Sequence, residues 1–177
     1  MKNYIKNLKL LTKNHVYSKE MEHDACGVGA IVSTEGKKSR IIVEYGIEAL
    51  KAVWHRGAVD ADGKTGDGAG IHLEIPKDFF IEKIEVTGHD YDNSEICVGM
   101  IFLPRNDYSA QESCKTIVES ELTRNNFSIY GWRQVPVNPK ILGQKALQTM
   151  PEIMQVLFKS NDKNLLNKDL ERKIYET

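Results

Sequence analysis

The chain of 177 residues has the length of one domain, which usually holds about 100–200 residues. Its 41% hydrophobic and 28% charged residues are typical of a globular protein, and its net charge of −1 gives no electrostatic basis for binding nucleic acid or a membrane. No apolar run approaches the roughly 18 residues of a membrane span. The 3 cysteines form no C-x-x-C pair, which disfavours a disulfide framework or a metal site and favours a reducing, cytoplasmic setting.

The first 25 residues differ in composition from the rest. Five lysines precede any acidic residue, and three acidic residues then cluster just before Cys26. The apolar core of a secretory signal is missing. Two interpretations stay open: a frayed leader, or a propeptide that ends at Ala25.

The next elements are expected to be two strands and a helix. Residues 27–33 begin with small residues and continue as a β-prone run, and a second short strand is expected over 41–43. Over residues 46–57 the apolar period becomes helical, and a glycine is placed to end the helix.

A loop and two strands are expected in the middle of the chain. Residues 58–68 are rich in Gly and Asp, which is typical of a loop. Alternation over 71–75 predicts a half-buried strand, and 96–103 form a continuous apolar run that predicts a buried one. Between these strands, residues 81–95 are polar and are expected to be exposed.

The C-terminal third is expected to hold three helices and a strand. Ser109–Glu112 match a capping box that would open a helix. Residues 127–135 predict a strand broken by a glycine. Pro151 is placed to open another helix, because proline is tolerated in a first turn. A last helical segment is expected over 166–174.

Cys26 is the candidate catalytic residue. It lies at the start of the small-residue segment, and removal of the preceding peptide would leave its own α-amine beside the sulfur as a base. The alternative is a buried structural cysteine, since free cysteine is among the most buried residue types.

Residues 57–70, here called the Asp/Gly loop, approach three known motifs and match none. A phosphate-binding loop requires its first glycine at position 58, and Gly57 lies one residue too early. An EF-hand loop requires an acidic residue or Asn at the position of Lys64. The dinucleotide-binding fingerprint G-x-G-x-x-G has no match in the chain. A nucleotide-binding module is the weaker functional alternative.

The motifs of this chain resemble one family. The likeness extends from about Glu22 to the C-terminus, and four stretches carry it: residues 22–29, 55–71, 98–104 and 131–137. They are similar to the N-terminal part of the class II glutamine amidotransferase domain of glutamate synthase large subunits. The long Asp/Gly loop after His55-Arg56-Gly57 resembles that of glutamate synthases in particular.

This resemblance implies an α+β fold, the four-layer αββα sandwich of the Ntn hydrolases, incomplete in this chain. Residues 1–25 would be a propeptide and 26–177 the N-terminal portion of the amidotransferase domain. Cys26 would attack the side-chain amide of glutamine, forming a thioester and ammonia. Arg56 would line the glutamine pocket; its alternative role is to cap the preceding helix.

The resemblance also implies partners outside this chain. Ammonia would pass to a synthase domain that makes glutamate from 2-oxoglutarate. FMN, an iron–sulfur cluster and an electron donor, either NAD(P)H or ferredoxin, would belong to the complete enzyme, and no cofactor or metal is expected here.

One part of the family pattern is missing. The family's oxyanion hole is an Asn-Gly pair, and no Asn-Gly dipeptide occurs in the chain. An oxyanion donor commonly contributes ~10²–10³ in turnover. We therefore expect a truncated piece with little activity alone; an inactive or unprocessed interaction stub is the other alternative.

Overall fold

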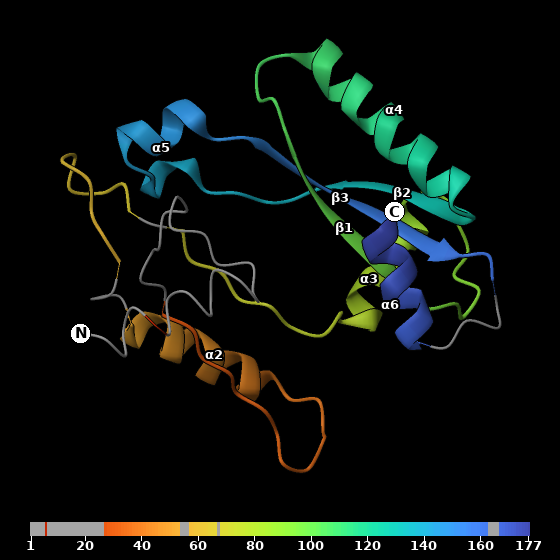
Figure 1. Cartoon of the computed structure of the whole chain (residues 1–177), viewed down its shortest axis with the longest axis horizontal. Coiled ribbons are helices and arrows are strands. Elements are labelled where there is room, and N and C mark those ends of the chain that lie inside the picture. The colour runs from red at the N-terminus through yellow and green to blue at the C-terminus, as the bar shows by residue number, and fades with distance from the viewer. Residues whose placement is uncertain (1–5, 7–26, 54–56, 67, 163–166) are drawn as a thin grey trace. The chain divides into compact units, whose positions relative to one another are not determined.

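The computed structural model describes residues 6, 27–53, 57–66, 68–162 and 167–177 (Figure 1). From residue 27 onward its elements are α2 (Arg40–Ala52), α3 (Lys77–Val86), β1 (Cys97–Leu103), α4 (Tyr108–Arg124), β2 (Phe127–Gln134), the 3-10 turn η2 (Pro139–Ile141), α5 (Gln144–Thr149), β3 (Glu152–Ser160) and α6 (Asn167–Glu176). The chain divides into two compact units: Met1–Ala58 with Asp67–Ile71, and Val59–Gly66 with His72–Thr177. This mixture of helices and sheet confirms the predicted α+β class.

The larger unit is built on an antiparallel sheet of three strands in the order β1-β3-β2. In the central strand, Val156, Leu157 and Phe158 are successive and all buried. Because successive side chains of a strand point to opposite faces, both faces of this strand are covered. The predicted helix after Pro151 is therefore wrong. The sequence of a strand that is covered on both faces contains a run of apolar residues without polar alternation. Periodicity alone does not distinguish such a run from a buried helix.

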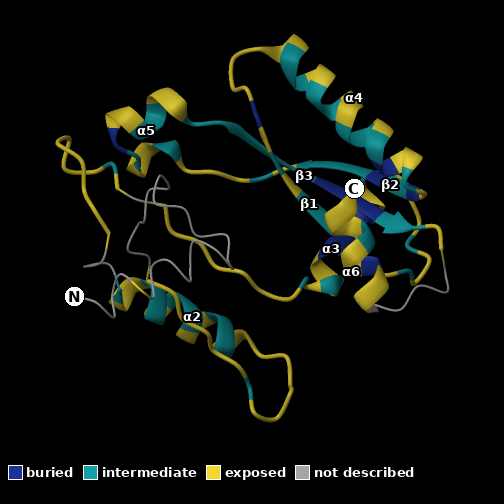
Figure 2. Cartoon of the chain, in the orientation of Figure 1, coloured by how far each residue is buried: buried dark blue, intermediate teal, exposed yellow. Residues whose placement is uncertain are grey.

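Helices cover both faces of the sheet. On one face, Leu122 of α4 and Leu170 of α6 join a cluster with Phe127 and Phe158 of the sheet. On the other face, the cover comes from α3, whose Phe80 and Ile84 pack with the strand residues Tyr130 and Leu157. Figure 2 shows these buried positions concentrated in the strands and in the helix surfaces that face them. The predicted exposure of residues 81–95 is thus wrong at Ile84, which is fully buried.

Helix α4 begins at a different cap from the predicted one. The carboxylate of Asp107 accepts a hydrogen bond of 2.9 Å from the backbone N–H of Ala110. An aspartate at this position satisfies one of the N–H groups that a helix start leaves unpaired. The Ser109–Glu112 capping box is wrong, since Ser109 is already inside the helix.

The smaller unit contains α2, which has a partly buried stripe and no buried residue. Residues 41–43 belong to the start of this helix, so the short strand predicted there is wrong. Their apolar side chains continue the helical spacing of the later residues Ile47 and Leu50, and this longer pattern decides the structure. Ile71 packs on the helix: a β-carbon on Gly46 would lie 3.1 Å from its Cδ1.

Two further predicted strands do not form. Residues 27–33 and 71–75 are extended or irregular, and they pair with no strand among the described residues. A strand requires a partner for its backbone hydrogen bonds, and local alternation does not supply one. The described part of the chain therefore holds one sheet of the expected two.

Candidate functional site

The two predicted site residues, Cys26 and Arg56, lie outside the described residues, as does His55. The structure describes the chain from Gly27 onward and again from Gly57 onward. Gly29 lies in open surroundings, with nothing within 4 Å of the position that a β-carbon would take.

The Asp/Gly loop is folded back on itself. Val59 and Gly66 form an isolated antiparallel bridge, and the N–H of Asp60 donates a hydrogen bond of 2.7 Å to the carbonyl of Thr65. At the tip, Gly63 has a φ of +68° and donates to the carbonyl of Asp60 over 2.9 Å. Residues with side chains rarely adopt this conformation, so glycine is required at the tip. The loop predicted over residues 58–68 is confirmed where it is described.

The Asp62 carboxylate stabilises the loop from inside. Its Oδ2 accepts a hydrogen bond of 2.6 Å from the Thr65 hydroxyl, and its Oδ1 accepts from the backbone N–H groups of Thr65 and Lys64 at 2.7 and 2.9 Å. The Thr65 hydroxyl, followed by these backbone donors, holds the pKa of Asp62 well below its usual range. The carboxylate is thus ionised and already occupied as an acceptor, which makes it a structural group rather than an acid or base.

A segment distant in sequence contacts this loop. The Lys145 Nζ of α5 lies 2.8 and 2.7 Å from the two carboxylate oxygens of Asp60, although the residues are 85 positions apart. Gly143, which precedes α5, is buried beside Thr65 and Asp62. Neither Gly143 nor Lys145 is indicated by the sequence, because no local pattern predicts a contact over such a separation.

The surroundings of the loop contradict the nucleotide-binding alternative. A phosphate-binding loop requires a helix directly after its Gly-Lys-Thr sequence. Residues 68–76 are described and none is helical. Two acidic side chains, Asp60 and Asp62, also lie in the loop where phosphate would bind.

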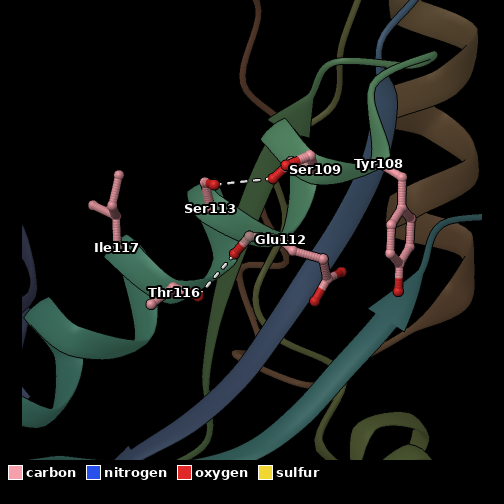
Figure 3. Close-up of a pocket in the computed structure, with 6 residues that line it drawn as sticks. All are labelled: Tyr108, Ser109, Glu112, Ser113, Thr116 and Ile117. Atoms are coloured by element: carbon pink, nitrogen blue, oxygen red, sulfur yellow. Dashed lines mark hydrogen bonds between the residues drawn. The ribbon is translucent and has the colours of Figure 1, made fainter.

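An open groove of about 590 Å³ lies along the start of α4 and is lined by Tyr108, Ser109, Glu112, Ser113, Thr116 and Ile117 (Figure 3). Two of its hydroxyls bond to the helix itself: Ser113 donates to the carbonyl of Ser109 and Thr116 to that of Glu112, each over 2.9 Å. No lining residue comes from the four motif stretches. The groove is therefore no candidate for the catalytic site.

Within the described ranges, no group of three or more His, Cys, Asp or Glu side chains is placed to hold a metal ion. No helix in the part of the chain that the structure describes has the length and apolarity to cross a membrane.

Residues 26–177 match the family "Glutamine amidotransferases class-II". The chain is 52% identical to the glutamate synthase [NADPH] large chain of Azospirillum brasilense, over 96% of this chain and 11% of that protein. It is 39% identical to the ferredoxin-dependent glutamate synthase 1 of Arabidopsis thaliana, over 87% of this chain and 9% of that protein. It is also 38% identical to the ferredoxin-dependent glutamate synthase of Pyropia yezoensis, over 94% of this chain and 11% of that protein.

The chain thus spans about a tenth of the length of these relatives. The family match covers the length of the domain predicted to begin at Cys26, and it confirms the Ntn-hydrolase fold class. The agreement of motif, fold class and relatives leads to one assignment. The chain belongs to the class II glutamine amidotransferases, of the type found in glutamate synthase large chains.

Proposed function

We propose that this domain hydrolyses the side-chain amide of glutamine with Cys26 as an N-terminal nucleophile, after removal of residues 1–25. One observation carries the proposal: the family match begins at residue 26, which is the motif cysteine itself. An N-terminal nucleophile has to be the first residue, because its own α-amine serves as the base. The lysine-rich and then acidic segment before it is the propeptide in this proposal.

The chemistry follows from the two groups of one residue. A free thiol has a pKa of about 8.5 and an α-amine one of about 7.7–8.0, so proton transfer between them is nearly balanced close to neutral pH. The amine takes the thiol proton as the sulfur attacks the amide carbon, and the proton then passes to the departing ammonia. Water hydrolyses the resulting glutamyl thioester, releasing glutamate and restoring the thiol.

Arg56 is proposed to bind the substrate. Its guanidinium is always charged and has a donor fork that matches a carboxylate, which glutamine carries. It follows the helix α2 closely in sequence and lies at the start of residues 55–71, the longest of the four motif stretches, directly before the Asp/Gly loop. Capping of the preceding helix remains its alternative role.

The domain is proposed to act within a glutamate synthase, which uses the ammonia to convert 2-oxoglutarate to glutamate. The relatives named for NADPH and for ferredoxin are 52% and 36–40% identical, which favours a pyridine nucleotide as electron donor. FMN and the iron–sulfur cluster belong to the rest of that enzyme. The 3 cysteines of the chain are widely spaced and form no C-x-x-C pair, so they do not fit the closely spaced thiolate ligands of such a cluster.

A reducing compartment such as the cytoplasm is proposed as the location. Cys97 and Cys114, the two cysteines in the described residues, are both free thiols. Free thiols persist where the surroundings are reducing.

A matched pair of cysteine variants tests the function in the full-length enzyme. Cys26→Ala is expected to abolish glutamine-dependent synthesis and to retain ammonia-dependent synthesis. Cys114→Ala, on the half-exposed part of α4, is the control and should retain both activities. Glutamine-dependent turnover that survives Cys26→Ala would overturn the proposal.

A further inference from the structure

The start of α5 packs against residues 60–65 of the Asp/Gly loop. Gly143 is buried against the loop, and the N–H of Ala146 approaches the Thr65 hydroxyl at 3.5 Å. The Thr65 hydroxyl in turn donates to Asp62 over 2.6 Å. The same loop residues thus bond to each other and pack against a segment about 80 positions later in the sequence.

Gly143 is required for space and not for its backbone conformation. Its φ of −72° is available to any residue. A β-carbon there, however, would lie 2.6 Å from the backbone nitrogen of Thr65, and closer still to the side chains of Thr65 and Asp62. Backbone atoms cannot move away without displacing the loop, so any other residue at Gly143 would push the loop off α5.

The Asp60–Lys145 ion pair is a second contact between the loop and α5. Both carboxylate oxygens of Asp60 contact the same Nζ, at 2.8 and 2.7 Å. Side-chain exposures of 62% for Lys145 and 35% for Asp60 make the pair a weak source of stability. Its contribution is instead geometric, because it links the loop to a residue of α5 that lies 85 positions away in sequence.

We propose that Gly143 and Lys145 are positioning residues for glutamine use, acting through Asp60, Asp62 and Thr65 of the Asp/Gly loop. The inference rests on the proposed glutaminase function. The loop continues the chain directly from the motif that contains Arg56, so its anchorage restrains the backbone that follows that motif. Displacement of a group that binds the substrate equally in the ground state and the transition state raises KM and leaves kcat unchanged.

Kinetics of the full-length enzyme test this role. Lys145→Ala should raise KM for glutamine roughly threefold to tenfold with little change in kcat, and Lys145→Arg should restore it. Ammonia-dependent synthesis should stay at the wild-type rate. Lys140→Ala, at an exposed position just before α5, is the matched control and should leave KM for glutamine unchanged.

Gly143→Ala should raise KM for glutamine further, by roughly tenfold or more. If this variant fails to fold, the comparison of Lys145→Ala with Lys145→Arg tests the inference by itself. A wild-type KM for glutamine in Lys145→Ala, or an equal loss of ammonia-dependent synthesis, would overturn the inference. A wild-type enzyme that uses ammonia and not glutamine would instead overturn the proposed function, and this inference with it.

Discussion

Gly99 of β1 lies directly opposite Val156 of β3, and a β-carbon on Gly99 would come within 2.8 Å of the Val156 Cγ1. Val156 is 1% exposed and β-branched, so its side chain has little freedom to move aside. Gly99→Ala should therefore lower the free energy of unfolding by about 1–3 kcal/mol, although alanine also stiffens the unfolded chain. Urea denaturation measures the change. Gly70→Ala, where nothing lies within 4 Å of the new methyl, is the control and should not destabilise the chain.

The cap of α4 gives a second prediction. Asp107→Ala should cost about 1 kcal/mol of stability, because the N–H of Ala110 loses its acceptor. Ser109→Ala should cost much less, since Ser109 is inside the helix. Thermal unfolding of both variants checks the order. A larger loss from Ser109→Ala would mean that the capping box predicted from the sequence is the true one.

Much of the fold was predictable from local patterns, and the predictions failed where contacts with distant parts of the chain decide the structure. The strand at 96–103, the helix after residue 109 and the last helix were expected and form. The central strand β3 was predicted as a helix, because its burial on both faces removes the alternation that marks a strand. Strands at 27–33 and 71–75 were predicted and do not form, because pairing is a non-local property that a single segment does not encode.

The candidate site was likewise predictable only in part. Motifs in the sequence indicate Cys26 and Arg56 as site residues, and their roles stay predictions because both lie outside the described residues. The contact between Asp60 and Lys145 could not be foreseen, since the residues are 85 positions apart. Gly143 carries no sequence signal either, because its need for space arises only from the folded loop.

Cys97 should be unreactive in the folded chain. Burial, with a smaller contribution from Glu95, raises the pKa of its thiol to about 11. At pH 8 the thiolate fraction is then about one in a thousand, well below that of an ordinary thiol with a pKa near 8.5. Iodoacetamide labelling followed by peptide mass mapping should leave Cys97 unmodified until denaturant is added. Modification at the rate of a free peptide thiol would contradict its burial in the core.

The carboxylate of Asp92 makes stability depend on pH. The Lys159 ammonium contacts it most closely, and Ser94 and Tyr130 also donate to it, which holds its pKa well below the usual range. Because the folded pKa is depressed, this stabilisation is present above the unfolded pKa of about 3.9 and is lost as the pH falls below it.

Asp92→Asn should therefore reduce the free energy of unfolding at pH 7, and its difference from wild type should shrink below about pH 4. The difference should be small, since the Asp92 side chain is 41% exposed and solvent screens the ion pair. Asp90→Asn, at an exposed position two residues earlier, is the control. A difference that is constant from pH 7 to pH 3 would exclude the carboxylate as its source.

The most direct test of the central claim is to identify the first residue of the enzyme that hydrolyses glutamine. Intact mass and N-terminal sequencing of the natively produced protein should find a chain that begins at Cys26, with residues 1–25 removed. A protein that still carries Met1 to Ala25 and nevertheless hydrolyses glutamine would contradict the claim, because its sulfur and its terminal amine would then belong to different residues.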